Sequence, residues 1–175
     1  DRTGVNQDFV ELYNPNATVT PDMDISSWSL QVLSANATST EKIAKKNFEA
    51  GNKILARGFF LIGIDDFAGG DMNWASGSLN STSGATIFLV NGTTTISDFE
   101  DLRIGDQIAY GSGSGLLAPE AQAASLPATG QSLERKALQN ENCVSAQNSG
   151  EFSGNGCDTD NNESDLEVRS TPKPQ

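Results

Sequence analysis

The sequence concentrates cation-ligating side chains in one segment, residues 158–165 (DTDNNESD). Carboxylate and amide oxygens at alternate positions of a turn are the ligands by which proteins hold Ca²⁺. Asp158, Asp160 and Asn162 match the first three ligand positions of an EF-hand loop. Together with Asp165 they make up a candidate calcium site, and calcium is the one cofactor that the sequence suggests.

The match to an EF-hand ends after these three positions. Glu163 stands where the loop needs Gly, and Arg169 stands where it needs the bidentate Glu. The segment is therefore no EF-hand, although a looser calcium site stays open as an alternative. The favoured interpretation is a run of Asx turns, in which short side chains bond their own backbone and hold a surface loop.

Two further groups of polar residues resemble catalytic sets. The loop with Asp65, Asp66 and Asp71 carries paired carboxylates such as glycoside hydrolysis uses. Nothing in the sequence places them in an apolar pocket, so a solvated turn is the favoured interpretation. Ser132 lies near Arg135 in the sequence, but no His or suitably placed Lys is present to activate its hydroxyl. We therefore predict no catalytic residue in either group.

The composition excludes several classes of function. The chain of 175 residues contains no His, which excludes Ser–His–Asp and Cys–His catalysis and His-ligated zinc within it. Its formal net charge of −12 disfavours nucleic acids and anionic membrane surfaces as partners. No stretch approaches 18 apolar residues, so we predict no membrane insertion. We expect a protein that is not an enzyme.

The two cysteines point to the compartment. Cys143 and Cys157 are separated by 13 residues of polar, Gly-containing sequence, in which a thiol would not be buried as a small apolar group. A disulfide between them is the favoured interpretation, and it implies an oxidising, extracellular or cell-surface location. The alternative is two free thiols in a cytosolic protein.

Five Asn-X-Ser/Thr sequences are candidate glycosylation sites. The content of Asn, Ser and Thr predicts between two and three of them by chance, so the excess is small. The candidate acceptors are Asn16, Asn36, Asn80, Asn91 and Asn162.

Apolar residues alternate with a period of two over the first 110 residues, which is typical of strands. The expected strands are 9–13, 28–32, 54–64, 87–90 and 106–110. Eleven of the twelve aromatic residues lie in residues 1–110, so we expect the core there. Short strands with turn residues between them favour an all-β sandwich with long polar loops.

The remaining sequence is poorer in apolar residues. We expect a strand at 131–136, a disulfide-closed loop over 137–164 and a closing strand at 165–169. Residues 171–175 (TPKPQ) resemble the start of a Pro-containing linker. The expected organisation is one domain over residues 1–170, followed by this linker or tail.

Six blocks of sequence, in order, resemble the lamin tail domain family, and specifically its exported bacterial and archaeal members. The first block, DFVELYNP at 8–15, is similar to the family's strand and turn E-[FW]-[IV]-E-L-Y-N-P. The second, DISSWSL at 24–30, is similar to D-L-S-G-W-x-L. The other blocks are 54–64, 79–89, 130–135, and 158–162 with Asp165 and Leu166.

The resemblance implies an immunoglobulin-like β-sandwich, and no catalytic residue is assigned to the family. This sequence departs from the family pattern in two places. The family begins with a strand of the type hhINEh, where only residues 1–7 stand here, and the insertion around Cys143 and Cys157 has no counterpart. A first strand that is absent would leave a sheet edge that a neighbouring subunit could complete.

Three functions follow as expectations. The first is a non-catalytic structural or adhesion module of a secreted or cell-surface protein, which contacts proteins or glycans. The second is a calcium-dependent or carbohydrate-binding accessory module with its site at 158–165. The third is a subunit of an extracellular filament that self-assembles through a sheet edge.

Overall fold

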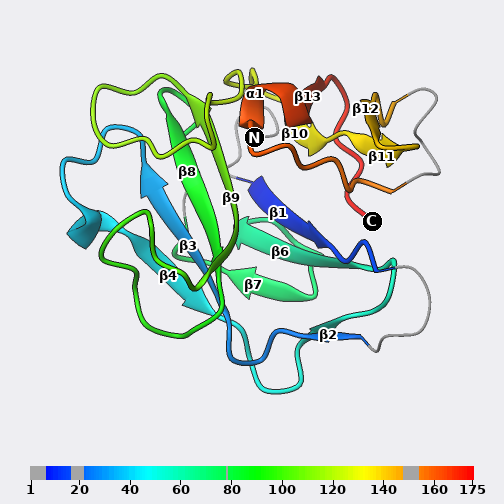
Figure 1. The fold of residues 1–175 in the computed structure, drawn as a ribbon. Helices are drawn as coiled ribbons and strands as arrows, with labels where there is room; N and C mark the ends of the chain where they lie inside the picture. Colours follow the sequence, from blue (N-terminus) through cyan, green and yellow to red (C-terminus); the bar gives the residue numbers. More distant parts are fainter. Residues whose placement is uncertain (1–6, 17–21, 78, 148–153) are drawn as a thin grey trace.

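Two layers of β-sheet form the body of the molecule (Figure 1). The computed structural model describes residues 7–16, 22–77, 79–147 and 154–175. Within them, helix is limited to the short turns η1 (Thr40–Lys42) and α1 (Asn162–Asp165). The prediction of an all-β fold is confirmed.

The first layer is a four-stranded antiparallel sheet in the order β4-β3-β8-β9. Its strands are β3 (Ser29–Ser34), β4 (Ala44–Asn47), β8 (Gly84–Val90) and β9 (Ile104–Gly111). The second layer has the order β1-β6-β7 and contains one parallel pair, β6 with β7. Its strands are β1 (Gln7–Tyr13), β6 (Phe59–Asp65) and β7 (Met72–Trp74). β1 and β9 are edge strands of their sheets, and β9 also forms an isolated parallel bridge between Tyr110 and Ala124.

Three two-stranded pairs surround the layers. They are β2 (Met23–Asp24) with β5 (Lys53–Ile54), β10 (Ser132–Arg135) with β13 (Leu166–Arg169), and β11 (Ala137–Gln139) with β12 (Asn142–Val144). The pair β10–β13 lies beside β1 and β9 in Figure 1, and Leu166 joins the main core.

The main core lies between the two layers, where Leu30 and Val32 of β3 share a cluster with Ile62 and Ile64 of β6. A second cluster forms on the other face of β3 and β8, because loops 91–103 and 112–118 cover that face. Phe88 is fully buried in this second cluster. β8 is therefore covered on both faces, which explains its continuous apolar sequence.

Most expected strands are present, but two predictions are wrong. The expected strand 54–64 is interrupted between β5 and β6, since Arg57 takes a φ of 54° and turns the chain. The expected loop 137–164 contains the hairpin β11–β12. Its two turn residues, Asn140 and Glu141, both have positive φ, as a tight two-residue turn requires. The predicted family strand before the first block falls on residues 1–6, outside the described residues.

Candidate functional site

A cleft of about 520 Å³ follows the edge of β1 that does not pair with β6. Six consecutive residues of β1, 8–13, line it, so side chains of both faces of the strand contribute. This lining places the cleft at the edge of the strand, because one face alone would supply only alternate residues. Residues 105–108 of β9 and 132–135 of β10 form the other walls. The volume is typical of ligand-binding sites.

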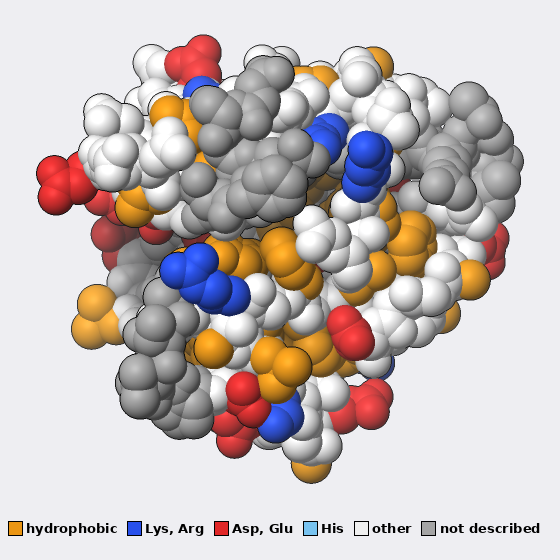
Figure 2. All heavy atoms as spheres, turned by 90° about the vertical axis from the view of Figure 1, so that its right-hand side faces the viewer, with side chains coloured by type: hydrophobic (Ala, Val, Ile, Leu, Met, Phe, Trp, Pro, Cys, Tyr) orange, Lys and Arg blue, Asp and Glu red, His pale blue; other side chains and the backbone are white. Residues whose placement is uncertain are grey.

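The inner wall of the cleft is apolar. Val10, Ile87, Leu89, Ile108 and Leu133 line it, and each is only partly buried although it packs against the main core. Figure 2 shows the side of the molecule that lies at the right in Figure 1. Apolar side chains gather near the middle of this side, with charged side chains around them. The described residues thus do not fully cover the main core on the side between β1 and β9.

The outer rim of the cleft carries charged side chains from β1, β9 and β10. Arg135 donates to Asp106 at 2.8 Å and lies 3.4 Å from Asp158, while Arg169 pairs with Glu134. Burial raises the pKa of Asp106, and the positive charge of Arg135 partly opposes that rise. Arg135 and Arg169 are therefore already paired at this rim.

Glu11 also lines the cleft, close to the C-terminal residues of the chain. Burial raises the pKa of Glu11, and the nearby negative charges of Glu134 and Asp71 raise it further. The Gln175 N–H, which donates to Glu11 Oε1 at 2.6 Å, lowers this pKa and so opposes the rise. Residues 171–175, predicted as the start of a linker, thus contact β1 through Gln175. Lys173 and Pro174 line the cleft as well.

Two of the four predicted calcium ligands hold the protein together instead. Asp165 is fully buried and accepts from the N–H and hydroxyl of Thr159 at 2.8 and 2.6 Å. Asn162 is also fully buried, and its Oδ1 accepts the Ala109 N–H at 2.8 Å. Their oxygens accept from internal donors, which argues against these two as ligands, and the prediction stays untested. Asp165 makes no Asx turn, because its carboxylate accepts from residues that precede it. In this segment Asn161 bonds the backbone that follows it, since its Oδ1 accepts the Ser164 N–H and caps α1.

Asp158 and Asp160 are exposed and lie with Glu120, a residue that the sequence did not single out. One carboxylate oxygen from each of the three lies within 4.8 Å of the others. Burial, followed by the charges of Asp106 and Asp158, raises the pKa of Glu120 to about 7. Bonds from Asn162 and Glu163 to the segment around Glu120 bring it here. No sequence motif links Glu120 to this segment.

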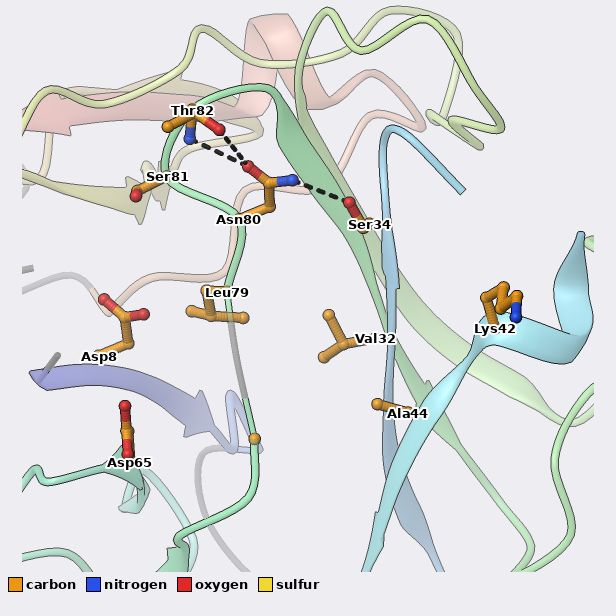
Figure 3. A pocket seen from close by; sticks show the side chains of 11 residues that line it. Asp8, Val32, Ser34, Lys42, Ala44, Asp65, Leu79, Asn80, Ser81 and Thr82 are labelled. Atoms are coloured by element: carbon orange, nitrogen blue, oxygen red, sulfur yellow. Dashed lines mark hydrogen bonds between the residues drawn. The ribbon is translucent and has the colours of Figure 1, made fainter. Parts of the chain in front are cut away.

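A second, more polar cavity of about 440 Å³ opens on the other side of residues 79–82. Figure 3 shows Asp8 and Asp65 on one side of it and Lys42 on the other. Asn80 lines it, with its amide oxygen accepting from Thr82 and its amide nitrogen donating to Ser34 at 2.8 Å. These bonds form an Asx turn and supply no catalytic arrangement.

The other acidic residues predicted near Asp65 do not gather at this cavity. Asp71 accepts the Leu61 N–H at 2.8 Å and so holds the loop 66–71 against β6. Asp66 does not line either cleft. The interpretation of this loop as a structural turn agrees with these positions.

A disulfide joins Cys143 and Cys157, as predicted. Cys157 is fully buried, and the bond ties the β11–β12 hairpin to the segment before α1.

The predicted glycosylation sites differ in exposure. The side chains of Asn16, Asn36 and Asn91 are exposed, whereas Asn80 is half-buried. Asn162 is fully buried and its Nδ2 donates to the Gln107 carbonyl, so the folded protein does not present it as an acceptor. This burial argues against a glycan on Asn162, and all five sites stay predictions.

Comparison of the chain with protein-family models, curated proteins and solved structures found no match. Among the described residues, no helix combines the length and apolar character needed to cross a membrane. The cleft beside β1 and the Glu120 cluster are therefore assessed on their geometry alone.

Proposed function

We propose that this chain is a non-catalytic structural or adhesion module of a secreted or cell-surface protein, and that it contacts proteins through the cleft beside β1. The single observation that supports this is the apolar, incompletely closed wall of the cleft, next to an edge strand. Exposed apolar surface that is framed by charged residues is typical of interaction sites.

The exported location and the family belong to the same proposal. A disulfide in a small domain is consistent with an oxidising compartment. An immunoglobulin-like lamin tail domain is supported by the sequence blocks described above and by a sandwich whose first described strand, β1, carries the first block. Glycan contacts stay a prediction that no described residue favours over protein contacts.

Photo-crosslinking from the cleft tests this function. A benzoylphenylalanine at Ser132, which lines the cleft, is compared with one at Leu102, which is fully exposed far along the β8–β9 loop. We expect irradiation on envelope or secreted fractions of the source cells to give a discrete protein adduct from position 132 only. Equal adducts from both positions, or none from either, would contradict a binding role for the cleft.

Calcium binding by Glu120, Asp158 and Asp160 is a second candidate function, favoured by the convergence of their three carboxylates. Hard cations gather several carboxylate oxygens in this way. We expect 2 mM CaCl₂ to raise the melting temperature relative to chelator, and Asp160→Ala to abolish the shift. Asp98→Ala, at an exposed carboxylate outside this cluster, is the matched control. An unchanged melting temperature of the parent protein would rule out the calcium function.

A further inference from the structure

We propose that the cleft beside β1 accepts one extended segment of a separate polypeptide, which adds as a strand to the free edge of β1 and carries alternating apolar side chains and a Lys or Arg. The inference rests on the proposed function and specifies the partner of the same cleft. It follows from the backbone of β1, the alternation of its side chains and the charges at the rim.

Within the described part of the chain, the backbone of β1 offers hydrogen-bonding groups to the cleft that no other backbone group bonds. The Asn14 N–H bonds the Gly58 carbonyl just beyond the β1–β6 register. Since bonded pairs alternate in an antiparallel ladder, Val10 and Leu12 bond across to β6. The N–H and C=O groups of Phe9, Glu11 and Tyr13 therefore point away from β6. Such a row of groups is the template to which an extended peptide adds.

The side chains of β1 dictate the pattern of the incoming strand. Val10 and Leu12 turn towards the main core, so the neighbouring inward positions of an added strand would face the apolar wall. Phe9 and Tyr13 lie on the opposite face, where they contact the rings of Phe67 and Phe59. Because side chains alternate between faces, the partner needs apolar residues at every second position.

Charge selects the residue opposite Glu11. Glu11 shares the outward face of β1 with Phe9 and Tyr13, and the charges that act on it, those of Glu134 and Asp71, are acidic. Its Oε1 accepts the Gln175 N–H, which leaves its other oxygen for a partner. The basic residues of β10 and β13 at this rim are already paired: Arg135 with Asp106, and Arg169 with Glu134. A Lys or Arg on the outward face of the added strand would pair with Glu11 in a cross-strand position.

A synthetic probe tests strand addition directly. The probe is a fluorescein-labelled, amidated seven-residue peptide in which Val alternates with Thr, with one central Lys replacing Thr. Two further versions carry N-methyl groups either on the Val residues or on the Thr and Lys residues, which blocks one edge of the strand in each. We expect binding, measured by fluorescence anisotropy in 150 mM NaCl, to fall at least tenfold for one version and less than threefold for the other. Equal effects of the two patterns, or no binding of the parent peptide, would overturn the proposal.

Variants of Glu11 separate backbone pairing from charge. Glu11→Pro removes an N–H that points away from β6, a position at which an edge strand tolerates Pro, and should weaken peptide binding at least tenfold. Glu11→Gln keeps the backbone donor and should weaken binding about two- to fivefold, with a smaller dependence on salt. Unchanged binding by both variants would count against the site. Near-ultraviolet circular dichroism checks that Glu11→Pro is folded, and the methylated peptides decide the question if it is not.

The remaining outcomes are distinguishable. If the chain alone forms dimers or polymers in sedimentation velocity and Glu11→Pro disperses them, the occupant is a second copy of this chain, and the proposal of a separate partner is overturned. If the peptides do not bind but adducts from position 132 persist, strand addition fails while the binding function of the cleft stands. If the peptides bind but position 132 gives no adduct, the proposed function of the cleft fails while strand addition to β1 stands.

Discussion

Asn162 bonds the free edge of β9 through Ala109, whose N–H lies 2.8 Å from its Oδ1. The same amide donates to the Gln107 carbonyl at 3.1 Å and to Glu120 Oε2 at 2.7 Å. One buried side chain thus takes the place of a neighbouring strand along part of β9. Among the described residues, β1 is then the edge that faces the cleft with backbone groups that no other strand bonds.

Asn162→Ala should lower the free energy of unfolding by about 2–4 kcal/mol, because it leaves the buried Ala109 N–H without its acceptor and the Gln107 carbonyl without a donor. Urea denaturation measures the change. Asn47→Ala, at an exposed residue of β4, is the control and should change stability by less than about 0.5 kcal/mol. Similar losses for both variants would contradict the role of Asn162.

Removal of the disulfide should destabilise the fold without changing the sheets. The bond closes a loop with a sequence separation of 14, for which the chain-entropy model predicts about 3 kcal/mol. We expect Cys143→Ser with Cys157→Ser to show a lower urea midpoint, and the far-ultraviolet circular dichroism to be retained. The parent protein under reductant should match the double variant. A midpoint that is the same in oxidised and reduced protein would contradict this prediction.

Stability should fall as the pH rises through the titration of Glu120. Its pKa is raised to about 7 in the folded protein from 4.5, so the folded state holds the proton more tightly than the unfolded state. The associated stability is fully present below pH 4.5 and is lost as the pH rises to about 7. Solvent around this half-buried group limits the effect to about 1 kcal/mol.

Glu120→Gln provides the comparison, since its amide oxygen can still accept from Asn162. We expect the variant to be more stable than the parent at pH 8 and to lack this part of the pH dependence. Thermal melts from pH 4 to pH 8 measure both. The raised pKa of Glu11 affects the parent and the variant alike and cancels in the difference. The charge of Asp106 acts on Glu120, so a part of the Asp106 titration remains in the difference. A constant difference over this range would contradict the prediction.

Two glycines with similar backbone angles should respond differently to Ala. Gly84 and Gly51 both have positive φ, 99° and 88°. A Cβ on Gly84 would overlap the Tyr110 carbonyl oxygen, whereas a Cβ on Gly51 meets nothing within 4 Å. Gly51→Ala should therefore cost only the left-handed conformation, about 1–2 kcal/mol.

Gly84→Ala adds the overlap to the same conformational cost, and we expect a loss larger by at least about 1–3 kcal/mol. Gly84 pairs with Gly111 where β8 meets β9, so the change should also disturb this end of the sheet. Urea denaturation and amide exchange of Tyr110 measure the two effects. Equal losses in the two variants would mean that this contact relaxes without cost.

The expectation of a strand was most reliable where alternation and burial agree. Val10 and Leu12 alternate with polar or outward residues, and they lie in β1 with their side chains on the main core. The expected strand at 54–64 was wrong at Arg57, because a left-handed residue leaves little trace in an apolar pattern. The hairpin β11–β12 was missed since its sequence is polar and short.

The candidate calcium site shows that residues which are close in sequence need not meet at one site. Asp158, Asp160, Asn162 and Asp165 are close in sequence, yet only the first two extend towards a common point. Asn162 and Asp165 point into the protein, because α1 carries them onto β9 and the segment at 159–161. Glu120 takes their place from a distant loop, a contact that only the packing of that loop against α1 creates.

The sequence by itself determined the fold class, the chemistry that is absent and the disulfide, since these depend on residue types and on local alternation. The lack of His, which excludes His-dependent catalysis within this chain, needed no structure. Only the tertiary structure decided which strand edge stays unpaired and which carboxylates meet. Alternation fixes the face to which a side chain turns, but the neighbour across an edge depends on how distant segments pack.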